Sequence, residues 1–237
     1  MQQLHNFVFF GTPTVASDTL ALLIERGFVP ALVVTSPDAP QGRGLVLTSS
    51  PTKTLALAHS IPILTPEKLD DAAIASIAAH RADYAIVVAY GKIFPEALIA
   101  AFPLGVLNVH YSLLPKYRGA TPLEAALLAG ERETGVTIQK MVKELDAGDI
   151  LAQESTPILS EETAHELRPR LISMGAKLLV ETLPAFARGE VTPVVQDPSL
   201  ATRSGKLKKE DGQLDLDAPA QLNWNKYRAY ADTIGTY

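Results

Sequence analysis

The sequence predicts an α/β protein with a doubly wound, mostly parallel β-sheet and a short C-terminal extension. Short apolar runs alternate along the chain with segments of helical apolar pattern, the order expected of strand–helix–strand units. Hydroxyl–proline pairs mark several helix starts, because Ser or Thr can cap a helix and proline suits its first turn. With 237 residues, 47% of them hydrophobic, the chain can bury a large core.

The first half of the chain holds the predicted parallel strands. The apolar run at residues 7–10 ends in Gly11-Thr12-Pro13, where we expect Thr12 to cap a helix that extends to Gly27. Ser50-Pro51 and Thr65-Pro66 predict the starts of two more helices. The other strands predicted in this half are Ala31–Val34, Ile61–Leu64, Tyr84–Val88 and Val106–His110.

The second half is predicted to be less regular. We expect Thr121 to cap its first helix, and Pro169 to kink or divide its longest one. From about Val191 the chain becomes extended and polar, so we expect a main domain at residues 1–205 and a linker at 206–237. The predicted elements are a helix at Leu123–Gly130, an alternating strand at Val136–Met141, a turn at Asp146–Asp149, a long helix from about Glu161 to Arg188 and a small helix at Trp224–Ala231.

Composition excludes several classes of function. The sequence contains no cysteine, so disulfides, thiolate nucleophiles and zinc–thiolate sites are excluded. No apolar stretch approaches the ~20 residues of a membrane span, and we expect a cytoplasmic monomer. The formal net charge of −5 argues against a uniformly basic nucleic-acid binder but leaves room for local patches, such as Arg43 with Lys53.

The most informative stretch is the end of the strand at Val106–His110. Side chains alternate along a strand, so Asn108 and His110 project on one side. An Asn can donate to a carbonyl oxygen that gains negative charge, while a His moves protons. This pair predicts acyl-group chemistry. The loop that follows, residues 112–122, mixes apolar, aromatic and cationic residues and suits a flat, partly apolar ligand with an anionic tail.

Two other segments are ambiguous by themselves. Gly11-Thr12-Pro13 follows a strand but lacks the glycine pattern of a nucleotide-binding loop, so we expect it to line another kind of pocket. Asp146 either forms an Asx-type turn or lies beside His110, where its charge would orient the ring and favour its protonated form.

The ordered motifs resemble the folate-dependent formyltransferases. The shared segments are Leu107-Asn108-Val109-His110, Ser112-Leu113-Leu114-Pro115, Arg118-Gly119, Glu133-Thr134-Gly135-Val136-Thr137 and Leu145-Asp146-Ala147-Gly148-Asp149. Further segments resemble the members that formylate methionyl-tRNA: Phe10-Gly11-Thr12-Pro13, Pro37-Asp38-Ala39-Pro40-Gln41-Gly42-Arg43-Gly44, Ser50-Pro51-Thr52-Lys53, Ser204-Gly205-Lys206-Leu207 and Tyr227-Arg228-Ala229. The resemblance covers nearly the whole chain and implies a Rossmann-like formyltransferase fold.

The resemblance also implies a reaction and a site. A formyl group would pass from 10-formyltetrahydrofolate to the amino group of methionine on initiator tRNA, with no metal. Asn108, His110 and Asp146 would be catalytic, and Arg43 and Lys53 would contact tRNA. The folate would lie against Ser112, Leu113, Leu114 and Pro115 and against the strand end that contains Val88, Ala89, Tyr90, Gly91 and Ile93.

The sequence departs from the family pattern in three places. Tyr111 replaces a usual glycine and could reshape the pocket mouth, and Thr121 replaces a usual alanine. The segment Ala231–Tyr237 differs from the family's Pro-Trp-Pro-like continuation, so we expect the family's C-terminal β-barrel to be missing. Two alternatives stay open: a formyltransferase for a small amine, either a sugar nucleotide or glycinamide ribonucleotide, and an inactive module that binds folate or tRNA.

Overall fold

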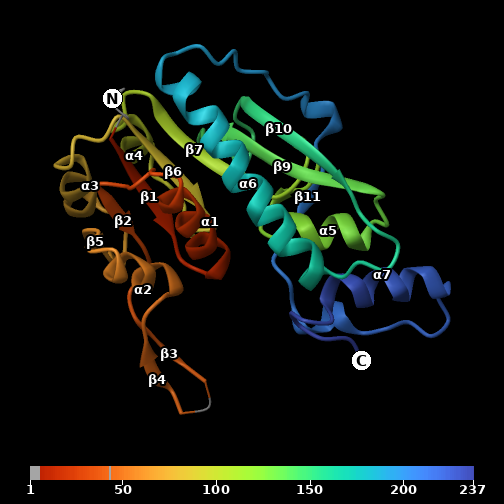
Figure 1. Ribbon diagram of the computed structural model, residues 1–237. Coiled ribbons are helices and arrows are strands. Elements are labelled where there is room, and N and C mark those ends of the chain that lie inside the picture. The colour runs from red at the N-terminus through yellow and green to blue at the C-terminus, as the bar shows by residue number, and fades with distance from the viewer. Residues whose placement is uncertain (1–5, 43) are drawn as a thin grey trace. The chain divides into compact units, whose positions relative to one another are not determined.

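The protein is described here from a computed structural model over residues 6–42 and 44–237 (Figure 1). Its chain divides into two compact units, which are described separately. Unit 1 comprises residues 1–109, 140–143 and 179–192, and unit 2 comprises residues 110–139, 144–178 and 193–237. The expected organisation into a main domain at 1–205 and a linker at 206–237 stays a prediction.

Seven strands form the main sheet. They are β1 (Phe7–Gly11), β2 (Leu32–Val34), β5 (Ile63–Leu64), β6 (Tyr84–Val88), β7 (Gly105–His110), β9 (Glu133–Lys140) and β10 (Ile150–Pro157), in the order β10-β9-β7-β6-β1-β2-β5. The pairs β5/β2, β2/β1, β1/β6 and β6/β7 are parallel, and β9/β10 is antiparallel. Later strands are added on both sides of β1, which confirms the predicted doubly wound, mostly parallel sheet.

The core of unit 1 is built on β1 and β6, whose residues are all buried. Continuous apolar strands of this kind are expected where a parallel sheet is covered on both faces. Phe10 contributes an edge-to-face contact with Phe94, at 4.9 Å between ring centroids, and a second one with Tyr90 at 5.5 Å. These rings pack at the carboxyl ends of the strands and fix the loop that follows β6.

Two predicted helix starts in unit 1 are wrong. Helix α1 (Thr14–Glu25) has Pro13 at its N-cap position, while the Thr12 hydroxyl contacts Ser36 Oγ at 3.1 Å. Helix α3 (Asp71–Ala78) starts well after Thr65-Pro66, because the Asp70 carboxylate accepts from the Ala73 N–H and caps the helix there. The remaining helices are α2 (Pro51–Ala58), capped as predicted by Ser50, and α4 (Glu96–Ala100), which was not predicted.

A β-hairpin in unit 1 was not predicted from the sequence. Strands β3 (Ala39–Gln41) and β4 (Val46–Thr48) pair antiparallel and project from the body of unit 1 (Figure 1). The side chains of Leu45, Val46 and Leu47 are at least two-thirds exposed. Because the hairpin has no buried face, its sequence lacks the apolar alternation by which strands are recognised.

Unit 2 contains β10, which was not predicted, and a short parallel pair, β8 (Arg118–Gly119) with β11 (Arg203–Ser204). Thr121 occupies the N-cap position of α5 (Pro122–Leu128), but its hydroxyl donates to the Gly205 carbonyl and makes no cap bond. The long helix α6 (Ala164–Ala187) is undivided at Pro169. The last elements are the 3-10 turns η1 (Pro198–Leu200) and η2 (Lys209–Gly212) and helix α7 (Ala220–Tyr230).

Candidate active site

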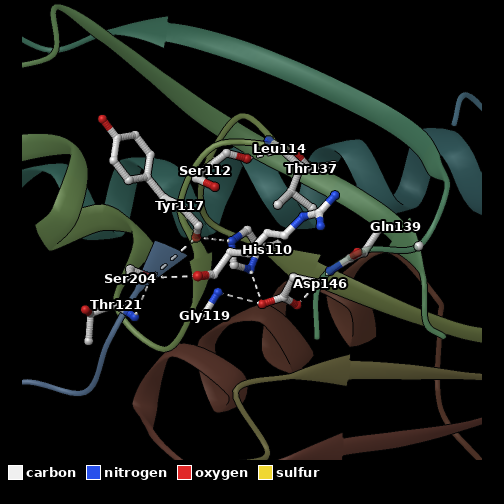
Figure 2. A network of polar contacts seen from close by, with 12 residues as sticks. His110, Ser112, Leu114, Tyr117, Gly119, Thr121, Thr137, Gln139, Asp146 and Ser204 are labelled. Atoms are coloured by element: carbon white, nitrogen blue, oxygen red, sulfur yellow. Dashed lines mark hydrogen bonds and ion pairs between the residues drawn. The ribbon is translucent and has the colours of Figure 1, made fainter. Parts of the chain in front are cut away.

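His110 ends β7, and both of its ring nitrogens face a polar group of unit 2 (Figure 2). Nε2 lies 2.9 Å from the Tyr117 carbonyl oxygen, and Nδ1 lies 3.7 Å from Asp146 Oδ2. Since a carbonyl oxygen can only accept, Nε2 must carry the hydrogen. In the neutral ring, Nδ1 is therefore the basic nitrogen, and it faces the carboxylate.

The protonation state of His110 is set by two opposing effects. Its side chain is only 5% exposed, and this burial lowers the pKa of His110 below its ordinary value of 6.5. The Asp146 carboxylate and the Tyr117 carbonyl raise that pKa, as expected from the sequence, but burial outweighs them. His110 is therefore neutral at pH 7. If Nδ1 is protonated, the Asp146 carboxylate can form an ion pair with the imidazolium.

Donors from two different elements hold the Asp146 carboxylate. The Gly119 N–H donates to Oδ2 and the Gln139 amide donates to Oδ1, both at 2.8 Å (Figure 2). The backbone of Asp146 has φ = 50°, a left-handed conformation that Asp tolerates better than most residues. The structure thus places Asp146 both in a turn and beside His110, so the two interpretations of this residue from the sequence hold together.

The Tyr117 carbonyl is positioned by the segment at β11. The Tyr117 N–H donates to Thr202 Oγ1 at 2.8 Å, and Ser204 pairs with Gly119 in the β8/β11 register. At Gly119, φ is 126°, and a Cβ there would lie 2.0 Å from the Ser204 carbonyl oxygen. Only glycine fits this position, which also supplies the N–H for Asp146.

The turn Ser112–Pro115 is braced from inside unit 2 by Thr137. The Thr137 hydroxyl donates to the Ser112 carbonyl at 2.6 Å and accepts from the Leu114 N–H at 3.2 Å. Ser112 and Leu114 are buried, while Leu113 and Pro115 are partly exposed. Of the four residues of this turn that were predicted to contact folate, Leu113 and Pro115 thus have the accessible side chains.

Unit 1 contains the other predicted folate segment and Asn108. Along the loop after β6, Ala89, Gly91 and Ile93 are exposed, and Ile93 reaches 92% exposure. Val88 and Tyr90 are buried, so neither side chain is presented to a ligand. Asn108, partly exposed, lies opposite Val87 in the β6/β7 register.

The two residues predicted to contact tRNA also belong to unit 1. Arg43 lies outside the described residues, between β3 and β4. Lys53 is near the start of α2, where its Nζ lies 2.7 Å from both Asp38 carboxylate oxygens. This ion pair neutralises much of the charge that a phosphate would meet, so Lys53 is a weaker anion ligand than its sequence position predicts.

Sequence reasoning missed four residues that shape this site: Tyr117, Gly119, Gln139 and Gln196. Tyr117 and Gly119 act through backbone groups, which carry no side-chain signal. Gln139 does carry one, since it is a long polar residue in a strand whose inner positions, its own included, are all buried. Gln196 lies far along the chain, in the segment predicted to be irregular.

Over residues 6–42 and 44–237, no group of three or more His, Cys, Asp or Glu side chains is arranged to hold a metal ion. No helix within the same residues combines the length and apolar character needed to cross a bilayer.

Sequence comparisons match this chain to one family. The family model described as Formyl transferase matches residues 5–183. A methionyl-tRNA formyltransferase of Synechococcus sp. (strain JA-3-3Ab) is 47% identical over 228 residues, which is 94% of this chain and 71% of that protein. The methionyl-tRNA formyltransferase of Koribacter versatilis (strain Ellin345) is 44% identical and covers 97% of this chain and 74% of its own length.

Solved structures share the fold at low sequence identity. The sugar 3N-formyltransferase WlaRD, solved in the presence of dTDP and 5-N-formyl-THF, has a TM-score of 0.72 and 18% identity, covering 96% of this chain and 80% of its own. Glycinamide ribonucleotide transformylase 1 from Symbiobacterium toebii has a TM-score of 0.68 and 19% identity, covering 83% and 96%.

Proposed function

This chain belongs to the methionyl-tRNA formyltransferases, and we propose that it transfers a formyl group from 10-formyltetrahydrofolate to the amino group of methionine on initiator tRNA. The observation that carries the proposal is the buried pair of His110 and Asp146 at the end of β7. This pair can accept a proton and stabilise the resulting charge, as an amine nucleophile requires. We further propose that it acts as a monomer in the cytoplasm, where a tRNA substrate would be met.

The residues at the strand ends fit a folate donor. A pterin is flat, has an apolar face and carries amide-like donors and acceptors at its edge. In unit 1, the exposed loop at Ala89, Gly91 and Ile93 offers small and apolar side chains with accessible backbone. In unit 2, Leu113 and Pro115 offer apolar surface on a turn braced by Thr137. Both segments suit a heterocycle read by backbone groups.

Each member of the catalytic set has a distinct role. The donor supplies the formyl carbon, and the methionine amine is the nucleophile, so the enzyme needs no nucleophile of its own. Asn108 donates from its carboxamide to the formyl oxygen as negative charge develops there. Nδ1 of His110 takes the proton that the amine loses, and Asp146 stabilises the imidazolium. The imidazolium then returns this proton to the nitrogen that loses the formyl group.

The acceptor end of tRNA would be recognised by the β3/β4 hairpin and the start of α2. Arg43 follows Gly42, whose positive φ of 68° belongs to the turn at the hairpin tip. A cation in this segment adds positive charge, which supplies much of the affinity for a phosphate backbone. Lys53 contributes less, because Asp38 already pairs with it.

A formyl-transfer assay with several acceptors tests the proposed function. The enzyme is incubated with 10-formyltetrahydrofolate and one of three acceptors: methionyl-tRNA, an amino-sugar nucleotide or glycinamide ribonucleotide. We expect turnover with methionyl-tRNA alone. Turnover with only a small amine would replace the tRNA assignment, and folate binding without turnover on any acceptor would identify an inactive binding module.

A further inference from the structure

Two buried glutamines connect the Asp146 turn to the rest of unit 2. Gln139 is 1% exposed on β9, and Gln196 is 5% exposed in the segment before η1. A buried primary amide is costly unless its oxygen and nitrogen both find partners. The partners of these two amides therefore show which groups of the turn they hold in place.

The orientation of each amide is fixed by its partners. Gln139 places its Nε2 against Asp146 Oδ1 at 2.8 Å, and a carboxylate can only accept. Gln196 donates from Nε2 to the carbonyl oxygens of Asp146 and Gly148, at 2.9 and 2.7 Å. Its Oε1 accepts from Arg118 Nε and Nη2, at 3.1 and 2.8 Å. Reversing either amide would place donors against donors or acceptors against acceptors.

The two amides are also in contact with each other. Gln196 Nε2 lies 3.5 Å from Gln139 Oε1, so a continuous set of polar contacts runs from the Arg118 guanidinium to the Asp146 carboxylate. One glutamine holds the Asp146 side chain, and the other holds the two carbonyls of its turn. The left-handed backbone of Asp146 is uncommon outside glycine, and these contacts help to hold it.

We propose that Gln139 and Gln196 are positioning residues for formyl transfer, with Gln139 fixing the Asp146 carboxylate opposite His110 and Gln196 fixing the turn that bears it. The proposal rests on the proposed function, because formyl transfer is the reaction that Asp146 would serve. The contacts of the two glutamines with Asp146 do not depend on that reaction. Gln139 bonds to the Asp146 carboxylate and Gln196 to the Asp146 carbonyl, so each acts through Asp146. Loss of the Gln139 donor removes a 2.8 Å hydrogen bond from Oδ1, which weakens the hold on the carboxylate opposite Nδ1.

The central test replaces the Gln139 amide with an apolar side chain of similar length, Gln139→Met. We expect kcat to fall about 10- to 100-fold, as for misplacement of a catalytic group by about 1 Å. The KM for methionyl-tRNA and for 10-formyltetrahydrofolate should stay within about twofold, because the Gln139 side chain is buried and is not presented to a ligand. The matched control is Gln221→Met on α7, where the exposed Gln221 donates only to Asn225, and we expect wild-type rates.

A double-mutant cycle separates positioning from a general structural role. In an Asp146→Asn background, Gln139→Met should cost no more than about twofold in kcat, because the group it positions is already impaired. An equal loss in both backgrounds would overturn the inference, as would an unchanged kcat in a folded Gln139→Met protein.

A second variant, Gln139→Glu, keeps the inference testable if the methionine variant folds poorly. At neutral pH its new carboxylate faces Asp146 and repels it, whereas at acidic pH the protonated form can donate and restore the lost bond. The ratio of its kcat to that of wild type should therefore rise as pH falls. A ratio independent of pH would contradict the role of Gln139 as a donor to Asp146.

The inference can fail separately from the proposed function. Imidazole titration of His110 by NMR needs no turnover, and Gln139→Met should lower the pKa of His110 further because the Asp146 charge moves away. An unchanged titration would overturn the inference even if formyl transfer is confirmed. Wild-type protein that formylates no acceptor would overturn the proposed function alone.

Discussion

Asp146→Asn is the substitution that most sharply tests the pairing of Asp146 with His110. It keeps the shape of the side chain and removes its charge. The carboxylate Oδ2 lies 3.7 Å from His110 Nδ1, with side-chain exposures of 10% and 5%. At this distance, and with an effective dielectric constant of about 20, a carboxylate and an imidazolium attract by about 4.5 kcal/mol.

The expected effect on turnover follows from this attraction. About 4.5 kcal/mol corresponds to a factor of more than about 1000 in rate if it is lost entirely at the transition state. The asparagine amide keeps a dipole toward the ring and recovers part of it, so we expect kcat to fall about 100- to 1000-fold. Single-turnover formylation of methionyl-tRNA with saturating folate donor measures this loss directly.

The same substitution has a separate effect on stability. Gln139 and the Gly119 N–H each donate to one oxygen of Asp146, and an asparagine can accept on only one side. One buried donor loses its acceptor, which should lower the free energy of unfolding by about 1–3 kcal/mol. Thermal denaturation shows how much protein is folded in the assay. A folded variant with kcat within threefold of wild type would refute the role of Asp146.

Three further results are expected. Burial lowers the pKa of His110 in the folded state, so the unfolded chain binds a proton at His110 more strongly than the folded protein does. The stability that neutral His110 contributes is therefore fully present above its ordinary pKa of 6.5. It is lost as pH falls from there through the pKa of the folded state. Urea unfolding across this range should show the decline, and His110→Gln should flatten it. Gly119→Ala would place a Cβ 2.0 Å from the Ser204 carbonyl oxygen, at a φ of 126°. It should therefore separate β8 from β11 and lower both the melting temperature and kcat. A melting temperature equal to that of wild type would contradict this. Arg43→Ala should raise the KM for methionyl-tRNA several-fold, more steeply at low salt, while folate binding measured by fluorescence stays unchanged; equal effects on both substrates would remove Arg43 from tRNA recognition.

The elements that could be predicted are those whose side chains face the core. The strands β1 and β6 and the first half of β7 are short apolar runs, because a parallel sheet covered on both faces favours apolar residues along its strands. The apolar sequence pattern is absent from elements that have little buried surface. Strand β10 has a single buried residue, Thr156, and the β3/β4 hairpin has none, so neither shows an apolar face in the sequence.

The site could be predicted only as far as side-chain chemistry is visible in a sequence. Asn108, His110 and Asp146 stand out by residue type, and the structure brings His110 and Asp146 together. The contacts that hold this pair come from the Tyr117 carbonyl, the Gly119 N–H and the distant Gln196. Backbone groups look alike at every position, and the Gln196 contact depends on the path of a chain segment that has no regular structure.

The central claim is that His110, paired with Asp146, takes the proton of the attacking amine during formyl transfer to methionyl-tRNA. The most direct measurement is the single-turnover rate of His110→Ala, with Asn108→Ala measured beside it as the variant that lacks the donor to the formyl oxygen. We expect His110→Ala to lose about 100- to 10,000-fold in rate and Asn108→Ala at least about 100-fold, both with wild-type circular dichroism. A folded His110→Ala protein that formylates methionyl-tRNA at a near-normal rate would contradict the claim.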